Sequence, residues 1–119
     1  MAIANISFTE AKGSDFFLEL IVEDADNVED HLAYFRMADG PDSSGNAIIT
    51  KNTTDPGDVI IHFGNRIVIH FESSETDYSS PIVAGQYYIE VTIENAGGLK
   101  KLAGQGIATF IDTNIKLGL

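Results

Sequence analysis

The chain contains no cysteine. It can therefore form no disulfide, hold no metal ion through thiolates and use no cysteine nucleophile. Basic residues are also few, because 7 lysines and arginines stand against 18 acidic residues and leave a formal net charge of -11. A surface this acidic repels a phosphate backbone and has few cations that could release its condensed counterions. We therefore expect no nucleic-acid partner.

Long apolar runs are absent as well. No stretch approaches the ~20 apolar residues that a membrane helix needs. The first residues, Met1 to Asn5, lack the basic and apolar regions of an export signal. We expect no membrane partner. What remains, 44% hydrophobic residues over a length of 119, is typical of one soluble globular domain that spans residues 1–119 around a single core.

The clearest pattern that is present has a period of two residues. It runs from Phe16 to Glu23 and again from Gln86 to Glu94, and it predicts two half-buried strands. Such alternation is typical of an antiparallel sheet with one face in water. The predicted inward residues are Phe16, Leu18, Leu20 and Val22 in the first strand and Tyr87, Ile89, Val91 and Ile93 in the second.

Between these strands the sequence predicts a β-hairpin. Two β-branched runs, Val59 to Phe63 and Arg66 to Phe71, are joined by Gly64 and Asn65. Both loop residues tolerate the positive φ of a two-residue primed turn. Such a turn places Phe63 opposite Arg66. The resulting register predicts a core face made of Ile60, His62, Ile67, Ile69 and Phe71.

Shorter segments complete the pattern of strands and turns. Residues 72–78 suit one helical turn in which a serine precedes acidic residues. About seven or eight short strands separated by turns indicate an all-β, antiparallel two-layer sandwich. The other predicted strands are Ile3 to Phe8 at an edge, Leu32 to Met37, Ile48 to Lys51, and Leu99 to Ile111 with a bulge or bend at Gly104 and Gly106.

Candidate metal ligands are scattered along the chain. The predicted hairpin register puts His62 and His70 on opposite faces, and His31 lies elsewhere in the sequence. The acidic run from Asp24 to Asp30 has oxygen ligands at alternating positions, as calcium sites do. It departs from the EF-hand loop, because Glu29 stands where the turn glycine belongs and Phe35 where the bidentate glutamate belongs. We therefore expect a solvated acidic loop, no metal ion and no other cofactor.

Catalytic motifs are missing too. No serine lies in a nucleophile-elbow context, and Gly104-Gln105-Gly106 falls inside a predicted strand with no helix after it. A glycosidase needs two carboxylates ~5 to 10 Å apart in a cleft, with the pKa of one raised, whereas pairs of acids arise by chance among 18 acidic residues. Asp39, Asp42 and Asp58 are interpreted as turn residues. We expect no enzymatic activity.

Aromatic side chains offer the best candidate for a binding surface. Tyr87 and Tyr88 are adjacent in one strand and therefore point to opposite faces. We interpret Tyr87 as core and Tyr88 as exposed. Because aromatic residues are enriched where surfaces bind, a possible interaction surface for protein or sugar consists of Tyr34, Tyr88, Asp24 and Asp26, with Tyr34 exposed.

Several segments, taken in order, resemble a known family. They are Gly13-Ser14-Asp15-Phe16, Ala33 to Met37, the glycine-led strand Gly64 to Phe71, Ala84 to Val91, and Gly97 to Gly104. This order resembles small immunoglobulin-like structural proteins of tailed bacteriophages and prophages, including the amino-terminal domains of some baseplate and receptor-binding-protein scaffolds. Glu90 stands where that family has an aspartate after its paired aromatics.

The resemblance implies assembly and not catalysis. It implies an immunoglobulin-like sandwich that serves as a subunit of the neck, tail or baseplate, in symmetric copies, within a virion assembled in the host cytoplasm. Its partners would be other phage structural proteins, reached through loops and through sheet edges, whose backbone groups are ready to pair. Because the sequence ends at Leu119 with no fibre-forming region, we expect a free-standing subunit. The alternative is a carbohydrate-binding module for host adhesion that uses Tyr34, Tyr88 and the loop acids.

Overall fold

The computed structural model describes residues 3–22, 28–40, 46–54, 58–62, 64–77, 80 and 82–112. Within these residues lie nine strands and one short helix. None of the helical residues described forms a segment long and apolar enough to cross a membrane. The elements are β1 Ala4–Asn5, β2 Phe8–Ala11, β3 Phe16–Ile21, β4 Leu32–Ala38, β5 Ala47–Asn52, β6 Val59–His62, β7 Arg66–Phe71, α1 Ser73–Thr76, β8 Gly85–Glu94 and β9 Lys100–Ile111.

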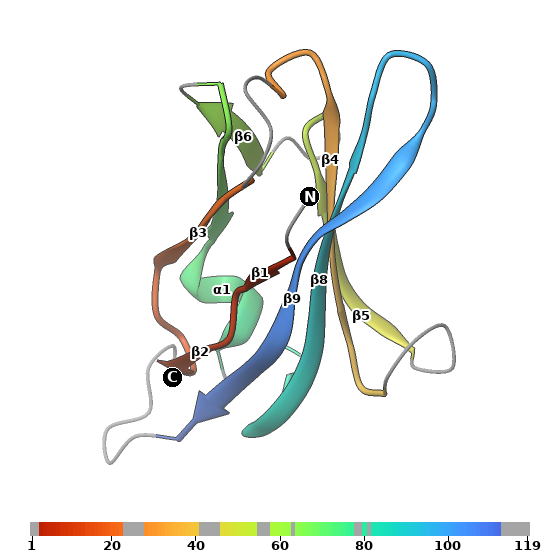
Figure 1. Cartoon of the computed structure of the whole chain (residues 1–119). Coiled ribbons are helices and arrows are strands. Elements are labelled where there is room, and N and C mark those ends of the chain that lie inside the picture. The colour runs from red at the N-terminus through yellow and green to blue at the C-terminus, as the bar shows by residue number, and fades with distance from the viewer. Residues whose placement is uncertain are drawn as a thin grey trace.

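The strands form two facing sheets (Figure 1). The large sheet has the order β1-β9-β8-β4-β5, with β2 also paired to β9. The small sheet has the order β3-β7-β6. The neighbours β3, β7 and β6 correspond to strands B, E and D of an immunoglobulin domain, and β4, β8 and β9 correspond to C, F and G. The fold is therefore an all-β immunoglobulin-like sandwich, which confirms the predicted fold class.

A tyrosine corner supports this assignment. The Tyr87 hydroxyl donates a hydrogen bond to the backbone oxygen of Val83 at 2.8 Å and accepts one from the Val83 backbone N–H at 3.1 Å. Immunoglobulin-like domains use a tyrosine near the start of strand F in this way, to tie the strand to the preceding loop. Here no disulfide joins the sheets, because the chain has no cysteine.

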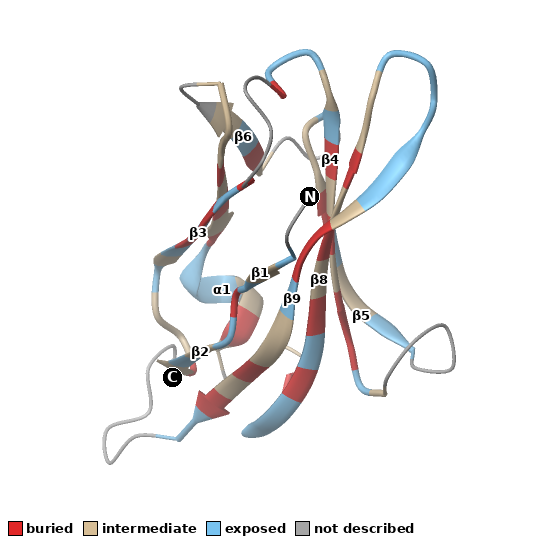
Figure 2. Ribbon diagram, in the orientation of Figure 1, coloured by how far each residue is buried: buried red, intermediate tan, exposed pale blue. Residues whose placement is uncertain are grey.

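The core follows from the alternation in the sequence. Buried and exposed residues alternate along β3 and β8, and the bands are visible along β8 in Figure 2. The predicted inward residues of β8 are all buried, and Tyr88 is exposed beside them. Phe71 lies at the centre of an aromatic cluster, with ring centroids 4.7 Å from Phe16 and 5.3 Å from Phe35.

The hairpin between β6 and β7 has a different register from the predicted one. His62 pairs with Arg66 and Ile60 with Val68. Three residues therefore separate the last pair, not two, and this shift of one residue turns Ile60 to the other face. Ile60 is consequently 51% exposed. The predicted core position of Ile60 is wrong, and so is the register that placed His62 on the core face and Phe63 opposite Arg66. The predicted core positions of Ile67, Ile69 and Phe71 in β7 are confirmed, since all three are fully buried.

The amino-terminal segment also differs from the prediction. Two short strands replace one edge strand, and both run parallel to β9, so the sandwich is not wholly antiparallel. Gly106 explains the close approach. A Cβ atom at this position would lie 2.6 Å from the backbone nitrogen of Ser7, and the Ser7 hydroxyl accepts a hydrogen bond from the Ile107 N–H at 2.9 Å. The predicted bulge in β9 is present, because the register shifts opposite Val91 and Thr92.

The predicted helical turn is α1. Its cap is Glu72, not a serine, and it forms a capping box with Glu75. The Glu72 N–H donates to the Glu75 carboxylate at 2.8 Å, which satisfies one backbone donor at the start of the helix.

Candidate interaction surface

A row of polar side chains crosses the outer face of the large sheet. Arg36 on β4 lies opposite Glu90 on β8, and Glu90 lies opposite Gln105 on β9. Asn5 of β1 and Thr50 of β5 extend the row at its two ends. Paired residues of neighbouring strands project from the same face. Five strands thus contribute to one continuous polar row.

The next row along the strands is apolar and contains the candidate binding residue Tyr88. Tyr88 lies opposite Ile107 on one side and Ala38 on the other. It is 45% exposed, and Ile3, which precedes β1, is 50% exposed. The exposed part of the Tyr88 ring is accessible to a partner.

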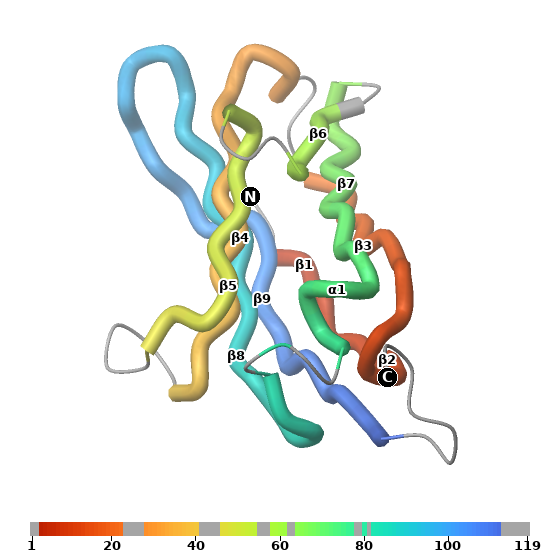
Figure 3. The backbone as a smooth tube through the Cα atoms, turned by 180° about the vertical axis from the view of Figure 1, so that it is seen from behind, coloured from red at the N-terminus to blue at the C-terminus, as the bar shows by residue number. Residues whose placement is uncertain are grey.

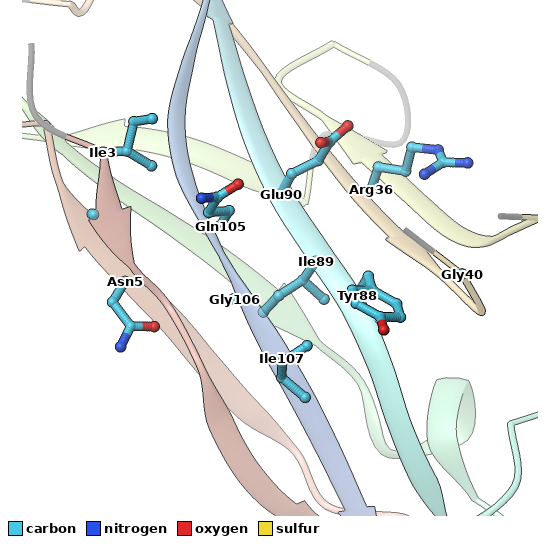
Figure 4. A pocket seen from close by; sticks show the side chains of 11 residues that line it. Ile3, Asn5, Arg36, Gly40, Tyr88, Ile89, Glu90, Gln105, Gly106 and Ile107 are labelled. Carbon is cyan, nitrogen blue, oxygen red and sulfur yellow. The ribbon is translucent and has the colours of Figure 1, made fainter. Parts of the chain in front are cut away.

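The two rows border an open hollow of about 460 Å³ (Figure 4). Figure 4 shows Arg36, Tyr88 and Ile107, which line it from three neighbouring strands. Of its 11 lining residues, Arg36 and Glu90 are the charged ones, with one charge of each sign. We define the outward side chains of these two rows, together with Ile3, as the docking surface. It is a locally neutral area on a chain of net charge -11.

Tyr34 lies on the same outer face but outside the docking surface. It pairs with Thr92, whereas Tyr88 pairs with Ala38, so the Arg36 row separates the two tyrosines. Its hydroxyl donates a hydrogen bond to the Glu94 carboxylate at 3.0 Å. Lys100 stands 5.8 Å from the ring centroid. The expectation that Tyr34 is exposed is therefore wrong, since it is half-buried.

The contacts of Tyr34 change its titration. The hydrogen bond to Glu94 raises the pKa of the Tyr34 hydroxyl above its ordinary value, and desolvation and the negative charge of Glu94 raise it further. The neutral phenol is the form that donates to a carboxylate. Tyr34 therefore acts as a hydrogen-bond donor inside the fold.

The predicted acidic members of the interaction surface, Asp24 and Asp26, lie outside the described residues. Two later acids of the same run contact the fold. The Glu29 carboxylate accepts a hydrogen bond from the Gly64 N–H at 2.9 Å, and the Asp30 carboxylate lies 2.8 Å from Nδ1 of His31. Among residues whose placement is described, no three histidines or acids gather closely enough to hold a metal ion.

The turn acids have different environments. The Asp39 carboxylate accepts a hydrogen bond from the Asn46 N–H at 2.7 Å, as expected of a turn residue. Asp42 lies outside the described residues. Asp58 is not merely a turn residue, because its carboxylate binds Nζ of Lys51 at 3.0 Å. Glu75 binds the same nitrogen at 2.6 Å.

This ion triad was not predicted from the sequence. The Lys51 side chain is 1% exposed, and the two acids are 29% and 26% exposed. Lysine is rarely buried unless paired. The triad joins β5, the start of β6 and α1, so we assign it a structural role.

His70 lies on the outer face of the small sheet. Its ring stacks on Phe17 with centroids 4.7 Å apart, and its Nε2 atom is 4.0 Å from the Asp15 carboxylate. The observed hairpin register pairs His62 with Arg66, so the register behind the opposite-face argument for His62 and His70 does not hold.

Comparison with known proteins adds little about function. No family model matches the chain, and no curated protein matches its sequence. One similar solved structure contains the extracellular domains of the voltage-gated sodium channel beta4 subunit, described as parallel homodimers that explain its role in cell-cell adhesion. It is 17% identical with a TM-score of 0.46, covering 95% of this chain and 96% of that one. At this level of likeness nothing about the binding or activity of this chain follows.

Proposed function

We propose that the chain is a non-enzymatic structural subunit of a tailed bacteriophage virion that binds a neighbouring virion protein through the docking surface. The observation that carries the proposal is the hollow beside Tyr88 and Arg36. Tyrosine and arginine are the residue types enriched among the dominant contacts of protein interfaces. The balanced charges of Arg36 and Glu90 lower the electrostatic cost of bringing a protein partner to this acidic chain.

The phage assignment rests on the resemblance of the sequence to immunoglobulin-like virion proteins. The docking surface supports it by offering a broad sheet face instead of an enclosed cleft. A partner that also carries basic groups would be drawn toward the rest of the surface, because the net charge is -11. The neck, tail or baseplate position within the virion is part of this proposal.

The test compares two exposed residues of β8. Tyr88→Ala removes the ring from the hollow, whereas Gln86→Ala truncates an exposed residue two positions away and outside the hollow. The purified protein is mixed with the virion proteins encoded by neighbouring genes, and binding is measured by calorimetry and co-elution. We expect Tyr88→Ala to raise the dissociation constant about tenfold or more, because aromatic anchors dominate interfaces, and Gln86→Ala to leave it unchanged.

Two results would contradict the proposal in different ways. Binding that persists unchanged in Tyr88→Ala would show that the partner docks elsewhere. A lack of binding to any neighbouring virion protein would remove the assembly role itself.

A carbohydrate-binding module is the second candidate, and the exposed Tyr88 ring favours it because aromatic rings can stack on sugars. Tyr34 gives it less support, since its hydroxyl is bound to Glu94 and its ring lies near Lys100. Glycan-array retention that disappears in Tyr88→Ala, without any protein partner, would place this candidate first.

A further inference from the structure

The edges of the two sheets differ in how well they are protected against pairing. At one edge of the large sheet, β1 and β2 are short and are interrupted between Asn5 and Phe8. At the other edge, β5 has a register shift against β4 and carries the inward-pointing Lys51. Short strands, irregularities and inward-pointing charges are devices that keep edges from pairing with other chains.

The small sheet has one short edge and one long edge. The edge strand β6 has four residues. The other edge strand, β3, makes six consecutive pairs with β7 with no register shift, and among the described residues it pairs with no other strand. In Figure 3 it lies at the outer margin of the small sheet. It has no proline and no lysine. Of the four edges it alone lacks these devices within the described part of the chain.

The topology explains why β3 is an edge. In immunoglobulin constant domains, strand A pairs with strand B on the same sheet. Here the amino-terminal strands β1 and β2 lie on the large sheet beside β9. The strand that corresponds to B, which is β3, therefore has one side of its backbone without a neighbour from the amino terminus.

The charge on β3 is neutralised within the fold. Its one charged residue is Glu19, which binds Arg66 through two nitrogen atoms, with Nε at 3.2 Å. Its outward residues Phe17 and Ile21 are 64% and 49% exposed. An apolar, locally neutral edge is a place where two chains of net charge -11 can approach.

The pattern of β3 is also self-complementary about Glu19. Phe17 and Ile21 flank it on the outer face, and Leu18 and Leu20 flank it on the inner face. An antiparallel copy centred on Glu19 places Phe17 opposite Ile21 and Leu18 opposite Leu20. Outer-face residues then pair with outer-face residues and inner-face residues with inner-face residues, as cross-strand pairing requires. A twofold contact needs a surface that matches itself in this way.

We propose that two copies of the chain join edge to edge through β3, antiparallel about a twofold axis at Glu19. The contact makes one continuous sheet with the order β6-β7-β3-β3-β7-β6. The two Glu19 carboxylates meet at the axis together with the two Arg66 guanidinium groups, so the centre carries no net charge. This contact is separate from the docking surface, which lies on the other sheet.

The contact is weak in isolation. A six-residue edge buries less than the about 1,000 Å² that a stable interface exceeds, so we expect a dissociation constant of roughly micromolar to millimolar. Salt strengthens it, because screening shortens the repulsion between two acidic chains to about 10 Å at 0.1 M.

The first test measures the dimer by sedimentation velocity, at low and at about 0.5 M salt, up to about 1 mM protein. Phe17→Lys places on β3 the residue that natural edges use to prevent pairing. Ile60→Lys is the matched control, because Ile60 is similarly exposed on the same outer face but on the opposite edge strand. We expect Phe17→Lys to raise the dissociation constant about tenfold or more, and Ile60→Lys and Tyr88→Ala to leave it unchanged. If Ile60→Lys weakened the dimer as much as Phe17→Lys, the two copies would be packing through the outer faces of their small sheets and not through their β3 edges. That result would overturn the proposal.

The second test uses the absence of cysteine. In Glu19→Cys the two thiols meet at the twofold axis, where opposite Cα atoms of an antiparallel pair lie about 4.5 to 5.5 Å apart, within disulfide range. Mild oxidation should link this variant into dimers, and more so at high salt, whereas Ile60→Cys should remain monomeric. Failure of Glu19→Cys to link at millimolar protein, or binding of β3 only to a strand of another protein, would overturn the pairing of two copies.

Discussion

The two sheets contribute similar inner faces to the core but differ in their outer faces and edges. The large sheet carries the polar row and the Tyr88 hollow on its outer face, and its edges are interrupted or carry an inward charge. The small sheet exposes the apolar side chains of Phe17, Ile21 and Ile60 on its outer face and has one regular edge. The core is thus shared, whereas the features that could bind other molecules are divided between the sheets.

This division suggests two kinds of contact. A broad face with a hollow suits a different protein that supplies complementary side chains. A regular edge suits backbone pairing, which needs little beyond an extended strand. This comparison of the two sheets can be tested by substituting inner and outer residues of one sheet, and by substituting residues of each sheet in turn.

The largest expected effect separates the two faces of the small sheet. Ile69 on β7 is fully buried, whereas Ile60 on the neighbouring β6 is 51% exposed. Ile69→Ala should lower the free energy of unfolding by roughly 2 to 4 kcal/mol, because it leaves a cavity in a packed core. Ile60→Ala should cost under about 0.5 kcal/mol, as most surface changes do. Denaturant unfolding of both variants gives the two values.

Similar costs for the two variants would contradict the observed hairpin register. A large cost at Ile60 with a small one at Ile69 would leave this register in place but show that the small sheet turns its other face to the core.

The next effect concerns the ion triad that ties β5 of the large sheet to α1 and the start of β6. Lys51→Met keeps most of the side-chain volume but leaves Asp58 and Glu75 without their shared cation. Breaking a buried ion pair typically costs several kcal/mol. Because both acids are about a quarter exposed, we expect a smaller loss of about 1 to 3 kcal/mol at neutral pH.

Lys101→Met is the matched control, since Lys101 is exposed on β9. Thermal unfolding of both variants should show a lower midpoint for Lys51→Met alone. Equal midpoints would mean that the triad does not stabilise the contact between the sheets.

The sequence was sufficient to predict the strands with regular alternation. The inward residues of β3 and β8 follow from a period of two, since one face of each strand must pack against the other sheet. The hairpin was predicted correctly as to its strands but not its register. Gly64 does have a positive φ of 82°, yet a glycine with positive φ fits loops of two and of three residues.

The site was harder to predict, because its contacts join residues distant in sequence. From the sequence alone we expected Tyr34 to be exposed. Its hydrogen bond to Glu94 joins diagonal neighbours on β4 and β8, so it depends on the register of these two strands. The Lys51 triad joins residues 7 and 24 positions apart. A lone lysine in a strand normally indicates a solvent-facing position, so no local pattern identifies it as buried.

A smaller effect is expected where the amino-terminal strands cover the edge of the large sheet. Gly106→Ala puts a Cβ within 2.6 Å of the Ser7 backbone, so β1 and β2 must shift. Overpacking typically costs about 1 to 3 kcal/mol, and a shift of a short terminal segment places the expected loss near the lower end.

Amide hydrogen exchange locates this loss. The Ile107 N–H, which donates to the Ser7 hydroxyl, should exchange faster in Gly106→Ala. Gly97→Ala is the control, because its added Cβ would meet only the Asn95 side chain. Unchanged exchange at Ile107 would show that the terminal segment tolerates the added atom.

The smallest expected effect is the pH dependence of Tyr34 at the end of the large sheet. Its folded-state pKa is raised, chiefly by the hydrogen bond to Glu94. The stabilisation from this bond is therefore fully present below the ordinary tyrosine pKa of about 10. It is lost as the pH rises through the higher folded value, because the phenolate can no longer donate and repels the carboxylate. The difference in tyrosinate absorbance between the wild-type chain and Tyr34→Phe isolates this titration. Glu94→Gln removes the charge and should move the pKa of Tyr34 back toward its ordinary value; if that pKa does not move, the Tyr34 hydroxyl is not bound to Glu94 in solution.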